Sequence, residues 1–290
     1  MAPQVWFITG ASRGLGRSVT ETVLQNGDIV VATARSTSVF SDLTSKYPES
    51  QLLVLSLDVS NVDAIKAAFK AATDKFGRID VVYNNAGAFT VGEAEAIPEA
   101  DARKLFDVNF WAASNVALEA IRVLREVNKP QGGRIITIGS ATGFAPLPGS
   151  NYYAASKFAI EGFIDALSME LDPAWNIRLT LVRPGGYDTG WEKGAQFYPA
   201  HPAYTAPHMP TEFGRQYMKT FKGYEGDPIK FAQTVYFKVA KAENPPSKLS
   251  LGLDCVGMVE GKLKAISEEA EKYKSWSAGL NKSDPPLNFA

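Results

Sequence analysis

Short apolar runs alternate with helical segments through the first two thirds of this 290-residue chain. Residues 5–8 and 29–34 are mostly apolar, which is typical of strands buried on both faces. The segment 62–76 between later runs is amphipathic at helical spacing and ends at a glycine. Parallel strands need crossover helices, so this alternation predicts a parallel sheet covered by helices on both faces.

The predicted elements make up one α/β domain over residues 1–290, a Rossmann-type doubly wound parallel sheet. We expect a cofactor-binding and catalytic core at 1–186, a substrate lid inserted at 187–226, and C-terminal helices with a last strand at 227–290. The predicted strands are 4–9, 29–34, 52–57, 79–83, 134–138, 177–182 and 248–251. The predicted helices are 14–25, a short one ending near 47, 62–76, 101–127, 153–171, 229–242 and 258–276. We expect the tail from Ser283 to be poorly ordered.

Composition excludes several classes of function. The net charge of −1 gives no field that would attract nucleic acid or an anionic membrane, and no apolar run approaches the roughly 20 residues of a membrane span. Cys255 is the only cysteine, so no intrachain disulfide can form, and two histidines without metal spacing argue against a metal site. The first strand begins almost at once, which leaves no room for a signal peptide, and we expect a cytoplasmic protein.

A glycine-rich turn joins the first strand to the first helix. Glycines let the backbone approach a pyrophosphate closely, and a helix N-terminus offers free N–H groups and a positive dipole end. The alternative is a turn needed only for tight packing of strand on helix. The predicted cofactor-binding residues of this turn are Thr9, Gly10, Ser12, Arg13, Gly14, Leu15 and Gly16.

The end of the second strand indicates which nicotinamide cofactor is used. An acidic residue there binds ribose hydroxyls in NAD-dependent proteins, whereas an arginine accommodates the 2′-phosphate of NADP. This chain has Arg35 and Ser36 with no carboxylate, and Arg13 could supply a second guanidinium. We therefore expect NADP(H); the alternative is that both arginines are solvated surface residues.

Tyr153 and Lys157 lie four residues apart on a predicted helix, and Ser140 lies thirteen residues before the tyrosine. Residues four apart share one face of a helix, so the phenol and the ammonium would project together. A nearby ammonium lowers the pKa of a tyrosine, which would make the phenol a usable proton donor near neutrality. Alternatively, Lys157 is a solvated lysine and Ser140 a turn residue before Gly143.

Taken together and in order, these motifs resemble those of the short-chain dehydrogenase/reductase family over about residues 4–190. The resemblance implies a catalytic tetrad, contacts to the adenine, a loop along the cofactor, and a segment that contacts the nicotinamide carboxamide. Two departures are small: Gly139 stands where a serine is common, and Arg183 could alter the charge near the nicotinamide. The implied residues are the tetrad Asn109, Ser140, Tyr153 and Lys157, then Asp58 and Val59, Asn85, Ala86 and Gly87, and Pro184, Gly185, Tyr187 and Thr189.

The resemblance also implies a mechanism. Tyr153 would donate a proton to a substrate carbonyl oxygen while Ser140 hydrogen-bonds the same oxygen. Lys157 would hold the nicotinamide ribose, and Asn109 would help to hold a water that relays protons to the lysine. Some proteins of this type instead regulate through NADP(H) binding or catalyse non-redox reactions, so both remain alternatives.

The segment after Tyr187 is rich in aromatic residues and predicts a lid over an apolar or aromatic, fairly large carbonyl or alcohol substrate. The alternative is that these aromatics pack the segment onto the body or form a subunit interface. The C-terminal part resembles the hydroxysteroid-dehydrogenase-like branch of the family. The resemblance to the family as a whole implies a homodimer or homotetramer formed through the helices around 101–127 and 153–171, and a monomer is the alternative.

Overall fold

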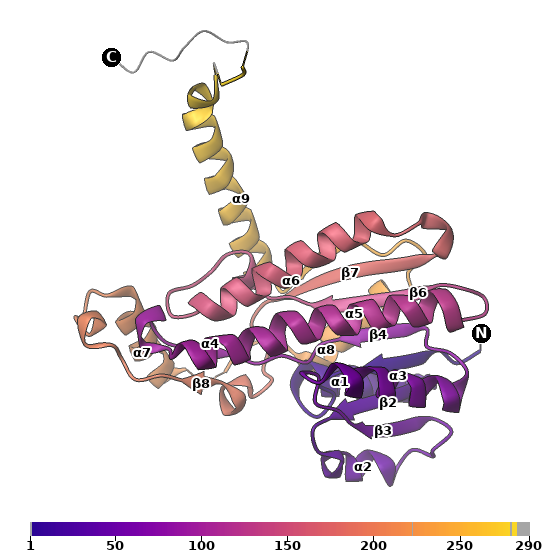
Figure 1. Ribbon diagram of the computed structural model, residues 1–290. Helices are drawn as coiled ribbons and strands as arrows, with labels where there is room; N and C mark the ends of the chain where they lie inside the picture. The colour runs from indigo at the N-terminus through magenta and orange to yellow at the C-terminus, as the bar shows by residue number, and fades with distance from the viewer. Residues whose placement is uncertain (1, 222, 279, 283–290) are drawn as a thin grey trace.

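A single parallel sheet forms the centre of the molecule (Figure 1). The computed structural model describes residues 2–221, 223–278 and 280–282. The sheet has seven strands in the order β3-β2-β1-β4-β6-β7-β9, and every neighbouring pair is parallel. The prediction of a single-domain Rossmann-type sheet is confirmed. The strands are β1 (Val5–Ile8), β2 (Ile29–Ala34), β3 (Leu52–Ser56), β4 (Val81–Asn84), β6 (Gly133–Ile138), β7 (Ile177–Pro184) and β9 (Lys248–Leu251).

The strand order reverses beside β1. The chain runs outward from β1 through β2 to β3, then returns to place β4 on the other side of β1. A reversal of this kind opens a crevice at the carboxyl ends of the strands, where doubly wound proteins bind ligands. The glycine-rich turn, the loop at Asn85, Ser140 and the segment from Gly185 each follow a strand, so the parallel sheet brings them to this one edge.

Helices cover both faces of the sheet (Figure 1), because neighbouring residues of a strand point to opposite faces. On β1, Phe7 stacks on Phe69 at 4.1 Å between ring centroids, and Trp6 stacks on Tyr236 of the opposite layer at 5.7 Å. All four of these residues are buried, so each face has its own apolar core. The first layer contains α3 (Val62–Phe76), α5 (Ala113–Arg122) and α6 (Asn151–Glu170); the second contains α1 (Gly14–Gln25) and α8 (Pro228–Thr234), which continues as η9 (Val235–Ala240).

The helix predicted at 101–127 begins slightly earlier and contains wider turns. It runs through α4 (Glu99–Phe106), a π-helical segment η3 (Asp107–Ala112), α5, and a second π-helical segment η4 (Val123–Val127). Wider turns of this kind often occur at functional sites. Asn109 lies in the first of them, facing the carboxyl edge of the sheet.

Shorter helices, strands and turns connect these elements. The short helix α2 (Ser41–Thr44) precedes β3. In the segment 187–226, η7 (Trp191–Gly194) is followed by β8 (Gln196–Phe197), η8 (Pro202–Tyr204) and α7 (Pro210–Thr220). Strand β8 pairs in parallel with β5 (Thr90–Val91) of the body, beyond which lies η2 (Ala94–Ala96); the other short turns are η1 (Thr37–Phe40), η5 (Ala141–Gly143), η6 (Pro173–Trp175) and η10 (Lys274–Ser277).

The last helix, α9 (Leu253–Tyr273), begins five residues before the predicted start at Met258 and ends before Trp276. Its first turn is fixed by long-range contacts, with Cys255 fully buried and Asp254 accepting a hydrogen bond from the Gly186 backbone. Periodicity could not predict these contacts. The tail predicted to be poorly ordered from Ser283 lies outside the described residues. No helix in the described part of the chain combines the length and the apolar character that crossing a membrane requires.

Candidate active site

The glycine-rich turn has the geometry of an anion-binding loop. Gly10 adopts φ +63°, a conformation that favours glycine, and a Cβ at Gly16 would lie 2.2 Å from the Gly10 carbonyl oxygen. Helix α1 begins at Gly14, and the side chain of the preceding Arg13 makes no cap hydrogen bond. The first-turn N–H groups therefore have no side-chain cap, so the turn fits a phosphate group.

The loop after β4 holds this turn in place. The Thr9 hydroxyl accepts hydrogen bonds from the backbone N–H groups of Asn85 and Ala86, at 2.9 and 3.0 Å. In the other direction, the Asn85 amide donates to the carbonyls of Thr9 and Gly10. Thr9 and Asn85 thus fix the two loops against each other, which sets the position of any cofactor bound between them.

The residues predicted to read the 2′ position lie at the surface. Arg35 and Ser36 are exposed directly after β2. Asp58, after β3, accepts hydrogen bonds from the backbone and hydroxyl of Ser60. These hydrogen bonds, together with the positive charge of Arg35, hold the pKa of Asp58 below its ordinary value. The guanidinium of Arg13 lies against Gly194, because a Cβ built there would be 1.8 Å from one of its nitrogens. Arg13 therefore contacts the predicted lid as well as the glycine-rich turn.

Tyr153 and Ser140 meet at the carboxyl edge of the sheet. Tyr153 lies in the first turn of α6, and Ser140 follows β6, with a hydrogen bond between their side chains. Ser140 also caps a short helical turn, accepting from the Thr142 backbone at 3.2 Å and sharing a 2.9 Å hydrogen bond with the Thr142 hydroxyl. Its turn role and its contact with the tyrosine therefore coexist.

Lys157 is buried on the same face of α6. Its Nζ donates to the Ile138 carbonyl at 2.9 Å and lies 6.0 Å from the centre of the Tyr153 ring. Burial lowers the pKa of Lys157 to about 8. Burial raises the pKa of Tyr153, and the hydrogen bond with Ser140 opposes this only in part. The predicted lowering of the tyrosine pKa is therefore wrong for this structure, because desolvation of the phenol dominates.

Asn109 joins the loop after β4 to helix α6. Its amide nitrogen donates to the Ala88 carbonyl at 2.9 Å and to the Ser156 hydroxyl at 3.0 Å, and its oxygen accepts from the Ala88 backbone at 2.8 Å. Both amide donors are thereby used within the protein. A Cβ at Gly87 would contact the Asn109 oxygen at 3.3 Å and the Lys157 nitrogen at 3.6 Å, so three predicted site residues converge there.

The segment after β7 closes the edge of the site. Thr189 lies beside Gly14 of the glycine-rich turn, with its Cβ 3.2 Å from the position of a Gly14 Cβ. Tyr187 packs edge-on against Phe231 at 4.9 Å, and burial raises its pKa to about 12. Pro184 and Gly185 are half-buried between these contacts and β9.

Arg183 points away from this edge. Its guanidinium forms a buried ion pair with Glu161 of α6, including a 2.9 Å hydrogen bond from Nε, and lies over the Phe144 ring. The sequence allowed that this arginine alters the charge near the nicotinamide. The structure shows its charge paired inside the protein instead.

An aromatic wall leads outward from Tyr153. Phe89 lies on the Tyr153 ring at 4.1 Å between centroids, Trp191 lies on Phe89 at 4.9 Å, and Tyr224 lies 6.4 Å beyond Trp191. Trp191 and Tyr224 also line a cavity of about 650 Å³, a volume typical of small-molecule sites. Its lining residues are Tyr187, Asp188, Thr189, Trp191, Glu192, Phe197, Arg215, Met218, Lys219, Phe221, Gly223 and Tyr224.

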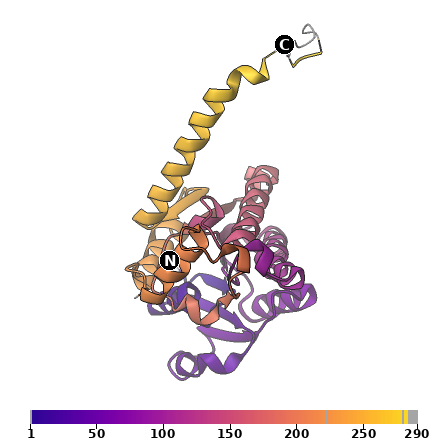
Figure 2. The same cartoon turned by 90° about the vertical axis from the view of Figure 1, so that its left-hand side faces the viewer.

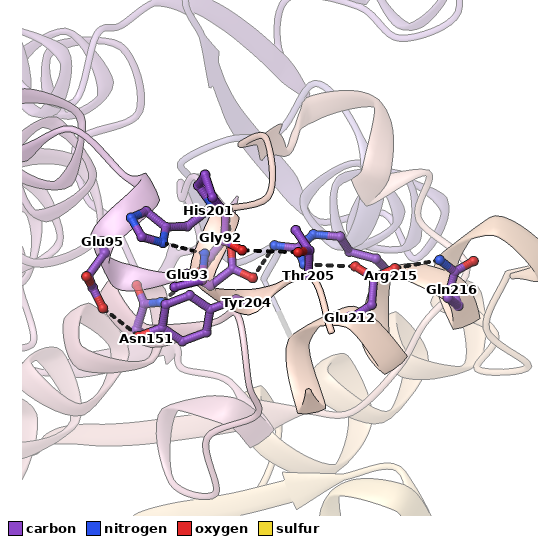
Figure 3. Close-up of polar contacts among 12 residues, drawn as sticks. Gly92, Glu93, Glu95, Asn151, His201, Tyr204, Thr205, Glu212, Arg215 and Gln216 are labelled. Atoms are coloured by element: carbon purple, nitrogen blue, oxygen red, sulfur yellow. Dashed lines mark hydrogen bonds and ion pairs between the residues drawn. The ribbon is translucent and has the colours of Figure 1, made fainter. Parts of the chain in front are cut away.

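A polar cluster holds α7 against the body (Figure 3). Arg215 of α7 forms an ion pair with Glu93, whose side chain is 1% exposed, and a second one with Glu212. Burial alone would raise the pKa of Glu93, but the hydrogen bonds that its carboxylate accepts, chiefly from Arg215, together outweigh burial and lower the pKa to about 2. Sequence reasoning missed Glu93 because 122 residues separate it from Arg215. It missed Phe89 too, although Phe89 lies only two residues after the Asn-Asn-Ala-Gly motif.

Comparisons with known proteins identify the family of this chain. A family model described as short chain dehydrogenase matches residues 4–196. This chain belongs to the short-chain dehydrogenase/reductase family. Members of this family are oxidoreductases that bind a nicotinamide cofactor. This chain is therefore an oxidoreductase of the nicotinamide-dependent kind. Among the described residues, no group of three or more His, Cys, Asp or Glu side chains could hold a metal ion.

Several relatives match most of the chain. An uncharacterized oxidoreductase of Schizosaccharomyces pombe is 38% identical over 96% of this chain and 92% of its own length. An 11-beta-hydroxysteroid dehydrogenase-like protein of Arabidopsis thaliana is 30% identical over 75% of this chain and 66% of its own. The crystal structure of a short-chain dehydrogenase from Streptomyces avermitilis superimposes with a TM-score of 0.86, at 31% identity over 97% of this chain and all of that one.

Proposed function

We propose that this protein is an NADPH-dependent carbonyl reductase that acts on a fairly large apolar or aromatic ketone or aldehyde, or catalyses the reverse reaction. The observation that carries the proposal is the convergence of Tyr153, Ser140 and Lys157 beside Gly87 at the carboxyl edge of the sheet. A protein that only binds a cofactor has no need for a buried phenol hydrogen-bonded to a serine.

Each residue has a chemical task in this proposal. Bound NADPH supplies the hydride. The Tyr153 hydroxyl donates a proton to the substrate oxygen, and the Ser140 hydroxyl hydrogen-bonds that oxygen as negative charge develops on it. Lys157, with a pKa of about 8, can hold or release a proton near neutrality beside the tyrosine. Asn109 acts by fixing Ala88 and the catalytic helix through Ser156.

The proposed cofactor site is built from the loops that follow five strands, β1, β2, β3, β4 and β7. The glycine-rich turn and the loop at Asn85–Gly87 would hold the pyrophosphate and the nicotinamide half, and Pro184–Thr189 would close over the latter. Arg35 and Ser36, exposed after β2, would bind the 2′-phosphate together with Arg13, and Asp58 and Val59 would lie along the adenine. Residues 187–226 would form the lid, because every lining residue of the cavity belongs to this segment and one of them, Trp191, is joined to Tyr153 through Phe89.

The first experiment measures NADPH and NADH oxidation at 340 nm against a panel of aromatic, steroid-like and polyketide-like ketones, with Tyr153→Phe as the control. We expect turnover with NADPH and a loss of about a thousandfold in kcat in the variant, since the proton donor is gone while the NADPH site is kept. NADPH binding without turnover on any ketone would favour a regulatory protein. Substrate conversion without NADPH oxidation would favour a non-redox enzyme.

Cofactor preference is tested separately with Arg35→Asp. Removing the guanidinium and adding a carboxylate should shift the ratio of kcat/KM for NADPH over NADH by at least about tenfold toward NADH, because a charge-assisted bond to the 2′-phosphate is lost. The exposed Arg103, whose partner Glu99 is also exposed, provides a matched control as Arg103→Asp. An unchanged ratio would contradict the proposed role of Arg35.

We also propose an assembly and a location for this protein. The outer faces of the long helices expose Trp111, Leu118 and Phe158, which suits a homo-oligomer formed through these helices. The cytoplasm is the proposed location because Cys255 is a free thiol and is the only cysteine in the chain.

A further inference from the structure

Helix α9 projects from the body of the molecule (Figures 1 and 2). Only its base is packed: Cys255 is fully buried with its thiol donating to the Arg183 carbonyl, and Val256, Met258 and Val259 are half-buried. From residue 260 to residue 272 every side chain is exposed. Isolated helices of this length are only marginally stable in water, so an exposed one points to a partner that stabilises it.

The exposed part carries a continuous apolar stripe. Leu263 and Ile266 are 52% and 45% exposed, and they lie at the centre of a series whose members are three and four residues apart in alternation. This spacing is the heptad pattern of a two-helix coiled coil, with the apolar residues at the first and fourth positions. The six members of the series are Val256, Val259, Leu263, Ile266, Ala270 and Tyr273.

Charged residues flank the stripe in a self-complementary way. Lys262 and Glu269 lie on the same side of it, at equivalent heptad positions. Lys264 of the helix pairs with Glu268 of its own chain, and Lys274, the residue directly after the helix, pairs with Glu271. If two copies pack antiparallel about Leu263 and Ile266, Lys262 faces the partner subunit's Glu269, and the two-fold axis repeats the pair.

We propose that α9 pairs with the α9 of a second copy of this chain as an antiparallel two-helix coiled coil. Coiled-coil axes lie about 8–10 Å apart. In a parallel pair the bases of the two helices would have to lie this close together. Cys255 at the base is already enclosed by the body of its own chain, so the two bodies would collide there. The antiparallel arrangement instead places the bodies at opposite ends of a rod of about 30 Å, the length of a helix of 21 residues.

A membrane surface fits this helix less well. Helices that lie on anionic membranes have a polar face rich in lysine and arginine. Here lysines and carboxylates alternate on the polar side, with Asp254, Glu260, Glu268, Glu269 and Glu271 against Lys262, Lys264 and Lys272. Mixed charge of this kind is typical of the flanks of a coiled coil.

The test measures the mass of the full chain by sedimentation velocity over a range of concentrations. The double variant Leu263→Glu/Ile266→Glu places two carboxylates in the proposed seam, and Ala265→Glu, on the opposite side of the helix, is the matched control. We expect the double variant to form an assembly of half the wild-type mass, with the dissociation constant raised at least about tenfold, and the control to behave as wild type. Equal masses for all three proteins would overturn the proposal, even if the body helices form an oligomer.

Charge reversal tests the orientation. Lys262→Glu should weaken the association by about threefold to tenfold, and adding Glu269→Lys in the same chain should restore it. In a parallel pair Glu269 would face the partner subunit's Lys274, so the second change would not restore it, and this result would overturn the antiparallel arrangement. Wild-type protein that stays a single copy and sediments with phosphatidylserine vesicles would overturn the proposal in favour of a membrane surface.

Discussion

The carboxyl edge of the sheet and the segment 187–226 form the two halves of the proposed site, but different interactions hold them. At the sheet edge, loops follow buried parallel strands and are fixed by hydrogen bonds between side chains and backbone, as between Thr9 and Asn85. In the segment, α7 has no buried residue, and its described polar contacts run through charged side chains such as Arg215 and Glu93. The segment is otherwise held by the short β5–β8 pairing and by aromatic contacts.

This difference separates the chemistry from the choice of substrate. The reacting residues depend on the core, so they are positioned whenever the chain is folded. The cavity wall depends on a few titratable and aromatic contacts, which can open at a lower free energy than the core. Substitutions should therefore have effects of different kinds in the two halves.

The largest effect is expected from the same substitution made once in each half. Gly16→Ala should reduce NADPH affinity about a hundredfold, because its Cβ would lie 2.2 Å from the Gly10 carbonyl oxygen and the backbone of the turn must move. Gly214→Ala in α7 meets no atom within 4 Å and should stabilise that helix by about 0.5–1 kcal/mol. NADPH titration measures the affinity of each variant, and thermal unfolding measures its stability. Equal effects of the two substitutions would contradict the difference between the two halves.

A smaller effect, in the sheet half, concerns Lys157. Burial lowers its pKa from 10.5 to about 8, so between these values the unfolded chain holds a proton that the folded chain has released. The free energy of unfolding should therefore rise with pH between pH 8 and pH 10.5, by roughly 3 kcal/mol at most. Below pH 8 the folded chain also holds the proton, so the full cost of burying the charged ammonium lowers the stability there. Urea unfolding from pH 7 to 10 measures it.

Lys157→Met should abolish this rise and stabilise the cofactor-free protein near pH 7. Lys104→Met, which changes an exposed lysine, is the control and should keep the rise. A wild-type free energy of unfolding that stays flat or falls between pH 8 and pH 10 would show that the ammonium is not buried as described.

The smallest effect is expected in the segment. Arg215→Met leaves Glu93 buried without its main partner, and should lower the local stability of α7 by about 2 kcal/mol, or speed its amide hydrogen exchange roughly thirtyfold. We expect KM for a bulky ketone to rise and kcat to change little. Arg103→Met, with both partners exposed, is the control.

This ion pair also predicts how the segment responds to acid. Glu93 has its pKa lowered from 4.5 to about 2, so its contribution is present above pH 4.5 and is lost as the pH falls toward 2. In Arg215→Met the exchange of α7 should become sensitive to acid at a higher pH than in wild type. If the core strands exchange as fast as α7 in the variant, the two halves unfold together and the comparison fails.

The sequence by itself determined the parts whose cause is local. Alternating apolar runs predicted the sheet, including the last strand Lys248–Leu251, because burial on a parallel sheet requires that pattern. The glycine-rich turn and the Tyr153–Lys157 spacing predicted where a site would form, because each motif follows a strand and parallel strands end at one edge. The heptad series of α9 was equally present in the sequence, although its meaning depends on the helix being exposed.

Only the tertiary structure decided the environment of each group. The ion pairs of Glu93 with Arg215 and of Glu161 with Arg183 join residues far apart in sequence, and no local pattern encodes which charges meet. The pKa of Tyr153 rises because packing desolvates the phenol, an effect of everything around the ring and not of its spacing from Lys157. Spacing along a helix fixes which side chains share a face, whereas burial and charge pairing depend on the whole fold.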